Sequence, residues 1–191
     1  MIDLPKTYMV RKKFLKIFGA KIFIETTGQP VQLLGNAKLK ALKLKEDVRI
    51  YADEAQTEEL IRIHARSILD FGAVYDVFES GSEQKLGSVK RNFGKSLFRD
   101  SWEIWDKNET VVGKIDEDSM ALALVRRFLS NLVPQRFGIT DANDTEIGRI
   151  VQNFNPFTVK LQVELNEGTA IDEQLVMVAT IMLAAIEGRQ N

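Results

Sequence analysis

Few residues of this chain have the types and spacing that catalysis requires. His64 is the only histidine, it lies in the alternating segment IRIHAR, and the chain contains no cysteine. Nucleophilic catalysis needs an activated nucleophile beside a base, and no such motif surrounds His64. We therefore expect His64 to be structural or exposed. The segments GSEQKLG (81–87) and GNAKLK (35–40) lack the glycine spacings of phosphate-binding loops. The sequence thus predicts a protein that is not an enzyme and has no cofactor.

The acidic stretch DANDTE begins like a calcium-binding loop. Asp141, Asn143 and Thr145 stand in alternate positions, as the first ligands of such a loop do. The pattern then fails, because Glu146 replaces the turn glycine and Gln152 stands where a bidentate glutamate is needed. We expect an ordinary turn here and no metal site.

Basic clusters are the strongest candidates for a binding site. Near an anionic membrane surface each Lys or Arg contributes about 1 kcal/mol of attraction. The alternative is a solvated outer strand face, whose charges also prevent edge-to-edge association. In KLKALKLK (38–45), Lys38 and Lys40 would lie on one face of a strand and Lys43 and Lys45 on the other. These lysines therefore do not necessarily form one basic stripe on a single face. The candidate lipid-binding residues are Arg11, Lys12, Lys13, Lys90, Arg91, Lys95 and Arg99.

The composition is that of an ordinary globular protein. The chain has 191 residues, of which 45% are hydrophobic and 28% are charged, and its net charge is −1. This length suits one substantial core, so residues 1–191 are predicted to form a single domain. A net charge near zero provides no general attraction to nucleic acid. The absence of cysteine favours the cytosol, and the first ten residues, MIDLPKTYMV, do not resemble a signal peptide.

One hairpin unit recurs five times along the chain. It consists of an apolar residue, any residue, an aliphatic residue, any residue, an acidic or turn residue, a polar turn and a second apolar strand. The alternation and the turn residues are typical of β-hairpins, and glycines inside the second strands suggest bulges or tight bends. The copies occupy 22–31, 48–63, 75–89, 102–115 and 137–150. The last three copies are the most similar to one another. Their aromatic, aliphatic and glycine positions are Tyr75, Val77 and Gly87, then Trp102, Ile104 and Gly113, then Phe137, Ile139 and Gly148.

The run from Leu175 to Ile186 is apolar on all sides, with Thr180 its only polar residue. As a helix it would be about 18 Å long, too short for a hydrocarbon core of about 30 Å. A helix without a polar face has to be buried all round. Thr169 is the predicted N-cap, with Asp172 completing a capping box.

The hairpins and three further extended segments, Tyr8–Ile17, Leu39–Leu44 and Thr158–Leu165, predict ten to thirteen strands. So many antiparallel strands favour closure. The predicted fold is therefore mainly β, a closed barrel around the buried C-terminal helix.

One segment interrupts the strand pattern. SMALALVRRFLSNL (119–132) predicts a short additional helix that Pro134 ends and that packs on the barrel wall or closes one end of the barrel. A membrane-interface helix is the weaker alternative, because only two basic residues lie on its polar face. Tyr51, Phe78 and Trp105 share one place in their hairpins and are predicted to face outward. We expect this helix to cover them, and a contact surface is the less favoured alternative. Trp102 and Ile104 are predicted to face the core and Glu103 the solvent.

The hairpin unit, the stretch GSVKRNFGKSLFRDSWEIWD (87–106) and the helix start Asp172, Leu175 and Val176 together resemble the LURP-one-related family. Its relatives are the phospholipid scramblases and the tubby C-terminal domains. The resemblance covers nearly the whole chain and implies a closed barrel of about twelve strands around a central C-terminal helix. Tubby-like relatives hold phosphoinositide headgroups with basic surface residues. The acidic calcium-linked segment of the scramblases is not matched in VELNEGTAIDE (163–173).

These observations predict a non-enzymatic module that binds anionic phospholipid headgroups, including phosphoinositides, or a protein partner at the cytosolic membrane face. A scramblase-like lipid translocator is one alternative, disfavoured because no predicted segment spans a bilayer. An enzyme acting on a small ligand inside the barrel is another, disfavoured because the helix should fill the lumen. We expect a cytoplasmic protein that is peripheral at the membrane and has no nucleic-acid partner. The oligomeric state is left open.

Overall fold

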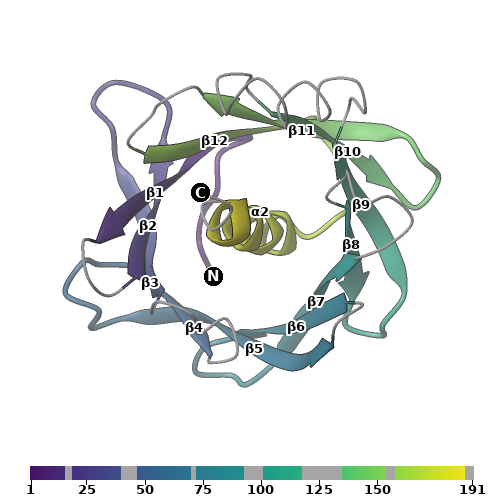
Figure 1. The fold of residues 1–191 in the computed structure, drawn as a ribbon, viewed down its shortest axis with the longest axis horizontal. Helices are drawn as coiled ribbons and strands as arrows, with labels where there is room; N and C mark the ends of the chain where they lie inside the picture. Colours follow the sequence, from purple (N-terminus) through teal and green to yellow (C-terminus); the bar gives the residue numbers. More distant parts are fainter. Residues whose placement is uncertain are drawn as a thin grey trace.

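The computed structural model describes residues 1–15, 19–39, 47–69, 72–92, 101–117, 135–153 and 158–187. Within this part of the chain, the strands close into an antiparallel barrel that surrounds a helix, as predicted (Figure 1). Each strand pairs with its neighbours in sequence, and β1 pairs with β12 to close the ring. The elements are β1 (Thr7–Leu15), β2 (Gly19–Thr26), β3 (Leu33–Leu39), β4 (Val48–Tyr51), β5 (Glu59–Leu69), β6 (Gly72–Glu79), β7 (Lys85–Asn92), β8 (Ser101–Asp106), β9 (Val111–Glu117), β10 (Arg136–Asp141), β11 (Glu146–Asn153), β12 (Thr158–Leu165) and α2 (Glu173–Glu187).

The five predicted hairpins are confirmed as β2–β3, β4–β5, β6–β7, β8–β9 and β10–β11. The extended segments predicted at 8–17 and 158–165 correspond to β1 and β12. The segment predicted at 39–44 lies outside the described residues except for Leu39, where β3 ends. The helix predicted at 119–132 lies outside them entirely.

Each hairpin carries a register shift at the same place, directly after its inward aliphatic residue. The shift leaves one extra residue on the second strand, which is the geometry of a β-bulge. This extra residue is aliphatic in every copy and packs, partly buried, against the core. The shifts follow Ile24, Ile50, Val77, Ile104 and Ile139. The extra residues are Leu34, Leu60, Leu86, Val112 and Ile147.

The strand glycines are opposite these bulges and make room for the helix. Gly87 pairs with Val77, and a Cβ added to Gly87 would lie 2.3 Å from the Trp105 carbonyl oxygen and 2.7 Å from Leu175 Cδ1. At Gly113 an added Cβ would lie 2.3 Å from Ile171 Cδ1. The glycines therefore let the wall approach the start of α2 more closely than any side chain would allow.

Replacing Gly87 by Ala should consequently destabilise the protein. The backbone oxygen of Trp105 cannot move without disturbing β8, so we expect a loss of about 1–3 kcal/mol in the free energy of unfolding. Urea unfolding followed by circular dichroism measures it. The matched control is Gly28→Ala, because an added Cβ there meets nothing within 4 Å. Equal losses in the two variants would contradict this account of the glycine.

The helix α2 lies in the centre of the ring (Figure 1). Every side chain from Leu175 to Ala185 is at most 2% exposed. Thr180 donates its hydroxyl to the Val176 carbonyl at 2.9 Å, which satisfies a hydroxyl that would otherwise be unpaired in an apolar lumen. No helix of the described residues is long and apolar enough to cross a membrane.

The N-cap of α2 is Asp172 rather than Thr169. The Gln174 amide donates to Asp172 Oδ1 at 2.8 Å, and the helix begins at Glu173. The chain must first turn from β12 back into the lumen, and Gly168, with φ of 73°, lies in that turn. Thr169 belongs to the same connection, where its hydroxyl oxygen accepts from the Ile171 amide at 3.5 Å.

Residues 1–6 lie across the end of the barrel where α2 begins. Ile2 and Leu4 are buried, and the Gln174 side chain bonds both backbone groups of Ile2, accepting from its nitrogen at 3.3 Å and donating to its oxygen at 2.7 Å. Lys6 also forms an ion pair with Glu173 at 2.5 Å. This segment therefore connects β1 to the first turn of α2.

Strand parity on β8 is as predicted. Trp102 and Ile104 are fully buried, whereas Glu103 lies on the outer face. There its carboxylate accepts from Asn92 Nδ2 and from Trp105 Nε1, both at 2.9 Å. Phe78 and Trp105 are half-buried on the outer face, each beneath a cation: Arg62 lies 5.9 Å and Lys90 5.1 Å from the respective ring centre. The predicted cover from 119–132 lies outside the described residues.

Candidate basic surface and polar hollow

The predicted basic residues do not converge on one surface. Arg11 and Lys13 on β1 and Lys90 on β7 alternate with buried residues and so face outward. The strands β1 and β7 are six strands apart around the ring (Figure 1). Arg91 takes an inward register position, since its strand partners Ala73 and Trp102 are both buried. Of the seven candidates, Lys95 and Arg99 lie outside the described residues.

Lys12 is not a surface residue, contrary to the sequence prediction. It shares the inward parity of Tyr8 and Val10 and is 3% exposed. Its ammonium group donates to the carbonyl oxygens of Ala184 and Ala185, each at 2.9 Å. These belong to the last turn of α2, where carbonyl groups lack helical partners and the helix dipole favours a cation. Lys12, on β1, therefore caps the C-terminal end of α2 from inside the barrel, and its ammonium group cannot reach a membrane.

Arg11 and Lys90 are each held by an outer-face carboxylate and an aromatic ring. Arg11 Nε donates to Glu25 Oε2 at 2.9 Å, and its guanidinium lies 4.4 Å from the Phe23 ring centre. The hydrogen bond with Glu25 raises the pKa of Arg11. Lys90 lies 3.5 Å from Glu103. These contacts neutralise much of both charges, so neither residue is an open anion site.

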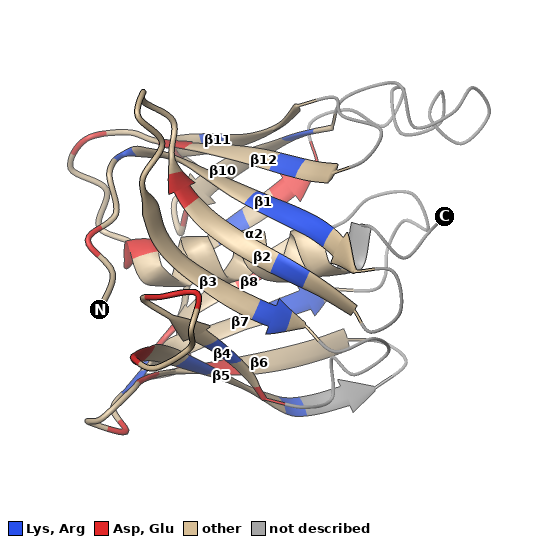
Figure 2. Cartoon of the chain, turned by 90° about the vertical axis from the view of Figure 1, so that its left-hand side faces the viewer, with Lys and Arg blue, Asp and Glu red and all other residues tan. Residues whose placement is uncertain are grey.

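Three other lysines form a line across neighbouring strands, which we call the basic row: Lys13, Lys21 and Lys38. Lys13 on β1 is directly opposite Lys21 on β2, and Lys21 is directly opposite Lys38 on β3. All three alternate with inward residues and so face outward. Figure 2 shows basic segments on β1, β2 and β3 in this line, with another on β12, where Lys160 pairs with Arg11.

The basic row lacks enough anionic partners to balance it. Neighbouring strands are about 4.8 Å apart, and like charges directly opposite each other are destabilising. Lys21 lies 3.5 Å from Glu54, whose side chain is 60% exposed. Lys13, Lys38 and Lys160 make no ion pair within the part of the chain that the structure describes. The row therefore presents a concentrated positive charge to solvent.

Sequence reasoning missed Lys21 and Lys160 because each is isolated from other basic residues along the chain. A signal for Lys21 was present. The hairpin formed by β1 and β2 places Lys21 opposite Lys13 once its register is known. Lys160 depends on the pairing of β1 with β12, which joins opposite ends of the barrel sequence.

A second charged cluster lies on the outer face of β5, β6 and β7, and it is internally satisfied. The Asp76 carboxylate accepts from Arg66 Nε at 2.8 Å and from the Ser88 hydroxyl at 2.7 Å, and Lys85 Nζ lies 3.1 Å away. Burial alone would raise the pKa of Asp76, but these hydrogen bonds and charges outweigh it. The pKa therefore lies well below its ordinary value of about 4.

Asp76→Asn should therefore destabilise the protein in a pH-dependent way. A carboxyl group whose pKa is lower in the folded state stabilises the fold above its unfolded pKa and loses this contribution as the pH falls. We expect a cost of about 1–3 kcal/mol at pH 7 that shrinks as the pH falls below about 4. Chemical unfolding at pH 7, 5 and 3 measures it, with exposed Asp144→Asn as the control. A cost independent of pH would contradict the assignment.

His64 and Asp141 have ordinary surroundings. The His64 side chain is 57% exposed, with Nδ1 2.7 Å from Asp47 Oδ1. Asp141 begins the β10–β11 turn, where Oδ1 accepts from the amides of Asn143 at 2.8 Å and Thr145 at 2.9 Å. The hydrogen bond from the Thr145 amide, with that from Asn143, lowers the pKa of Asp141. Among the described residues, no cluster of three or more His, Cys, Asp or Glu side chains could hold a metal ion.

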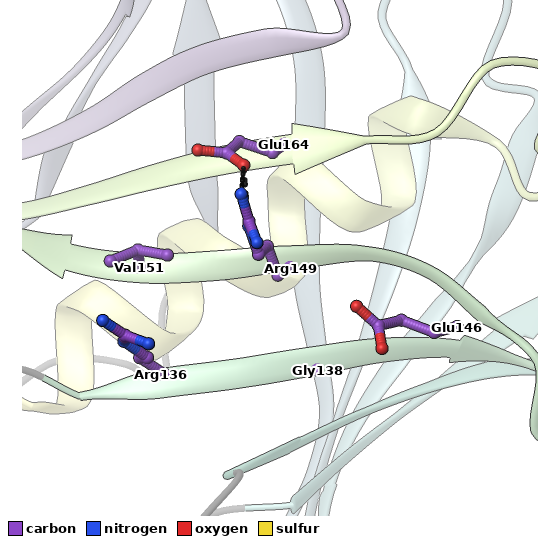
Figure 3. A pocket seen from close by; sticks show the side chains of 6 residues that line it. All are labelled: Arg136, Gly138, Glu146, Arg149, Val151 and Glu164. Atoms are coloured by element: carbon purple, nitrogen blue, oxygen red, sulfur yellow. Dashed lines mark hydrogen bonds and ion pairs between the residues drawn. The ribbon is translucent and has the colours of Figure 1, made fainter.

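A hollow of about 400 Å³ lies on the outer face of β10, β11 and β12 (Figure 3). Gly138 forms its floor. Arg149 leans away from Gly138 to pair with Glu164, with Nε 2.7 Å and Nη2 2.6 Å from Oε2. The residues that line the hollow are Arg136, Gly138, Glu146, Arg149, Val151 and Glu164.

The fold and these surfaces define a closed twelve-stranded barrel with an enclosed helix, a basic outer row and a polar hollow. Comparison with known proteins finds no matching protein-family model and no matching curated protein.

Proposed function

We propose that this protein is a non-enzymatic module that binds anionic phospholipid headgroups, phosphoinositides included, through the outer face of β12, β1, β2 and β3. The observation that carries the proposal is the basic row, in which Lys13, Lys21 and Lys38 stand directly opposite one another on adjacent strands. An anionic surface would relieve their mutual repulsion and add about 1 kcal/mol of attraction for each lysine. The module then works at the cytosolic face of a membrane, as a peripheral protein.

The interior of the barrel supports a binding role at the surface. Side chains from Leu175 to Ala185 occupy the lumen and are at most 2% exposed. A small-ligand reaction inside the barrel would have to displace the core on which the wall closes. The resemblance to LURP-one-related proteins agrees with this proposal, and we propose that the chain belongs to that family.

Vesicle co-sedimentation tests the proposal. We expect binding to phosphatidylcholine vesicles that contain phosphatidylserine or a phosphoinositide, and little binding to phosphatidylcholine alone. Raising the salt concentration from 50 to 300 mM should weaken the binding, because exposed charges are screened over a shorter distance. Absence of binding to every anionic vesicle at low salt would overturn the proposal and direct attention to a protein partner.

The triple variant Lys13→Gln, Lys21→Gln and Lys38→Gln should lose about 3 kcal/mol of binding free energy, roughly 100-fold in affinity. The control carries the same change in net charge elsewhere, as Arg62→Gln, Lys107→Gln and Lys114→Gln. Arg62 lies on β5, Lys114 on β9 and Lys107 in the turn before β9. An equal loss in the control would show that net charge, rather than the basic row, drives the association.

A further inference from the structure

The hollow over Gly138 exists because one hairpin lacks a side chain that its sister hairpins have. The position between the inward aromatic and the inward aliphatic is Asp76 in β6 and Glu103 in β8, and both of these carboxylates fill the outer face there. In β10 the same position is Gly138. Among the described residues, no side chain of β10 therefore covers the outer wall at this point, while the register shift of the unit is kept.

Two cations and two anions line the hollow, and one of each, Arg136 and Glu146, lies at opposite ends of it. Arg136 and Glu146 are both exposed, and neither forms an ion pair with another described residue. Arg149 and Glu164 satisfy each other along one side. Figure 3 shows Arg136 and Glu146 on either side of Gly138, with their charged ends apart.

The strand register fixes the spacing of these two charges. Glu146 pairs with Thr140, which is four residues beyond Arg136 on β10, with Gly138 midway between them. Four residues of a strand span about 13 Å. In an extended peptide, residues separated by two or four positions point to the same face. A peptide lying along β10 can thus place an acidic side chain at Arg136, an apolar one over the bare backbone of Gly138, and a basic one at Glu146.

We propose that this hollow binds an extended peptide segment of a protein partner, with an acidic residue, an apolar residue two positions away and a basic residue two positions further on. The site lies on β10, β11 and β12, and the basic row lies on β1, β2 and β3. The proposed lipid-binding face and the hollow share only β12, where Lys160 is opposite Arg11 and Glu164 lines the hollow. It does not depend on the lipid-binding proposal. With both surfaces occupied, the barrel would hold a partner protein beside a membrane.

A blocked peptide provides the probe: acetyl-Glu-Ser-Val-Ser-Lys-amide, titrated into the full-length ¹⁵N-labelled protein. We expect saturable chemical-shift changes centred on the amides of Gly138 and Val151. The control isomer, acetyl-Ser-Glu-Lys-Val-Ser-amide, has the same composition with adjacent charges, and it should not saturate the same signals. Equal binding of the two peptides, or shifts that avoid the hollow, would overturn the proposal.

Substitutions of the residues that line the hollow test how much each one contributes to peptide binding. Gly138→Gln supplies the missing side chain, which the sister hairpins already accommodate, and should abolish the saturable shifts. Arg136→Gln and Glu146→Gln should each weaken binding by about two- to fivefold, the range for exposed ion pairs. Lys107→Gln is the control and should bind like the parent. If Gly138→Gln melts at the parent temperature and still binds the peptide, or if both charge variants bind unchanged, the proposal fails.

Discussion

Removal of residues 171–191 will abolish the cooperative thermal unfolding of the protein. The deleted segment contains α2, which supplies the apolar side chains on which the wall packs, and a barrel of this size needs its interior filled. The inward residues of twelve strands would then surround water. We expect a broad, weak transition in circular dichroism melts and binding of a hydrophobic dye at room temperature. A cooperative melt near that of the intact chain would show that the helix is not the core.

Single substitutions in α2 also test whether this helix forms the core, with smaller expected losses of stability than the deletion. Leu183→Ala removes part of a side chain that is 1% exposed and should cost about 2–5 kcal/mol. Leu33→Ala is the matched control, because Leu33 is 38% exposed and should lose much less. Met177→Asp should be worse than either, since Met177 is fully buried and a carboxylate there would have neither water nor a partner.

The second large effect is expected at Lys12. Lys12→Met keeps much of the side-chain length but removes the group that donates to Ala184 and Ala185 at 2.9 Å. The two carbonyl groups would remain inside the barrel with less hydrogen bonding, and each buried unsatisfied group costs about 1–3 kcal/mol. We expect the free energy of unfolding to fall by about 2–5 kcal/mol, measured by urea denaturation.

The adjacent residue is a nearly ideal control. Lys13 has the same side chain but faces solvent, so Lys13→Met should change stability by less than about 0.5 kcal/mol. In vesicle binding the order should be reversed. Lys13→Met should weaken the affinity for anionic vesicles, whereas Lys12→Met, where it folds, should bind them like the parent. If Lys12→Met were as stable as the parent, the capping role would be wrong.

Much of the fold could be predicted because its signals are local. Alternation of apolar and polar residues defines each strand, and the turn residues between Val77 and Val89 or between Ile104 and Ile115 define each hairpin. The recurrent glycines indicated bulges, and the structure places a register shift opposite each of Gly87, Gly113 and Gly148.

The candidate site could be predicted much less well. Basic residues close in sequence alternate between the two faces of a strand, which separates Lys12 from Arg11 and Lys13. The parity of Lys12 could be inferred from Tyr8 and Val10, but a buried lysine is rare unless it has a partner. That partner is the end of a helix more than 170 residues away in the chain.

The sequence by itself determined the five hairpins, the inward and outward parity of strands such as β8, and the burial of α2. Each follows from periodicity, or from the lack of any polar face, within one short segment. Only the tertiary structure decided the closure of β1 on β12, the cap at Asp172, the role of Lys12 and the line formed by Lys13, Lys21 and Lys38. These depend on which distant segments become neighbours and in what register. A one-residue change in register would send every side chain of a strand to the other face.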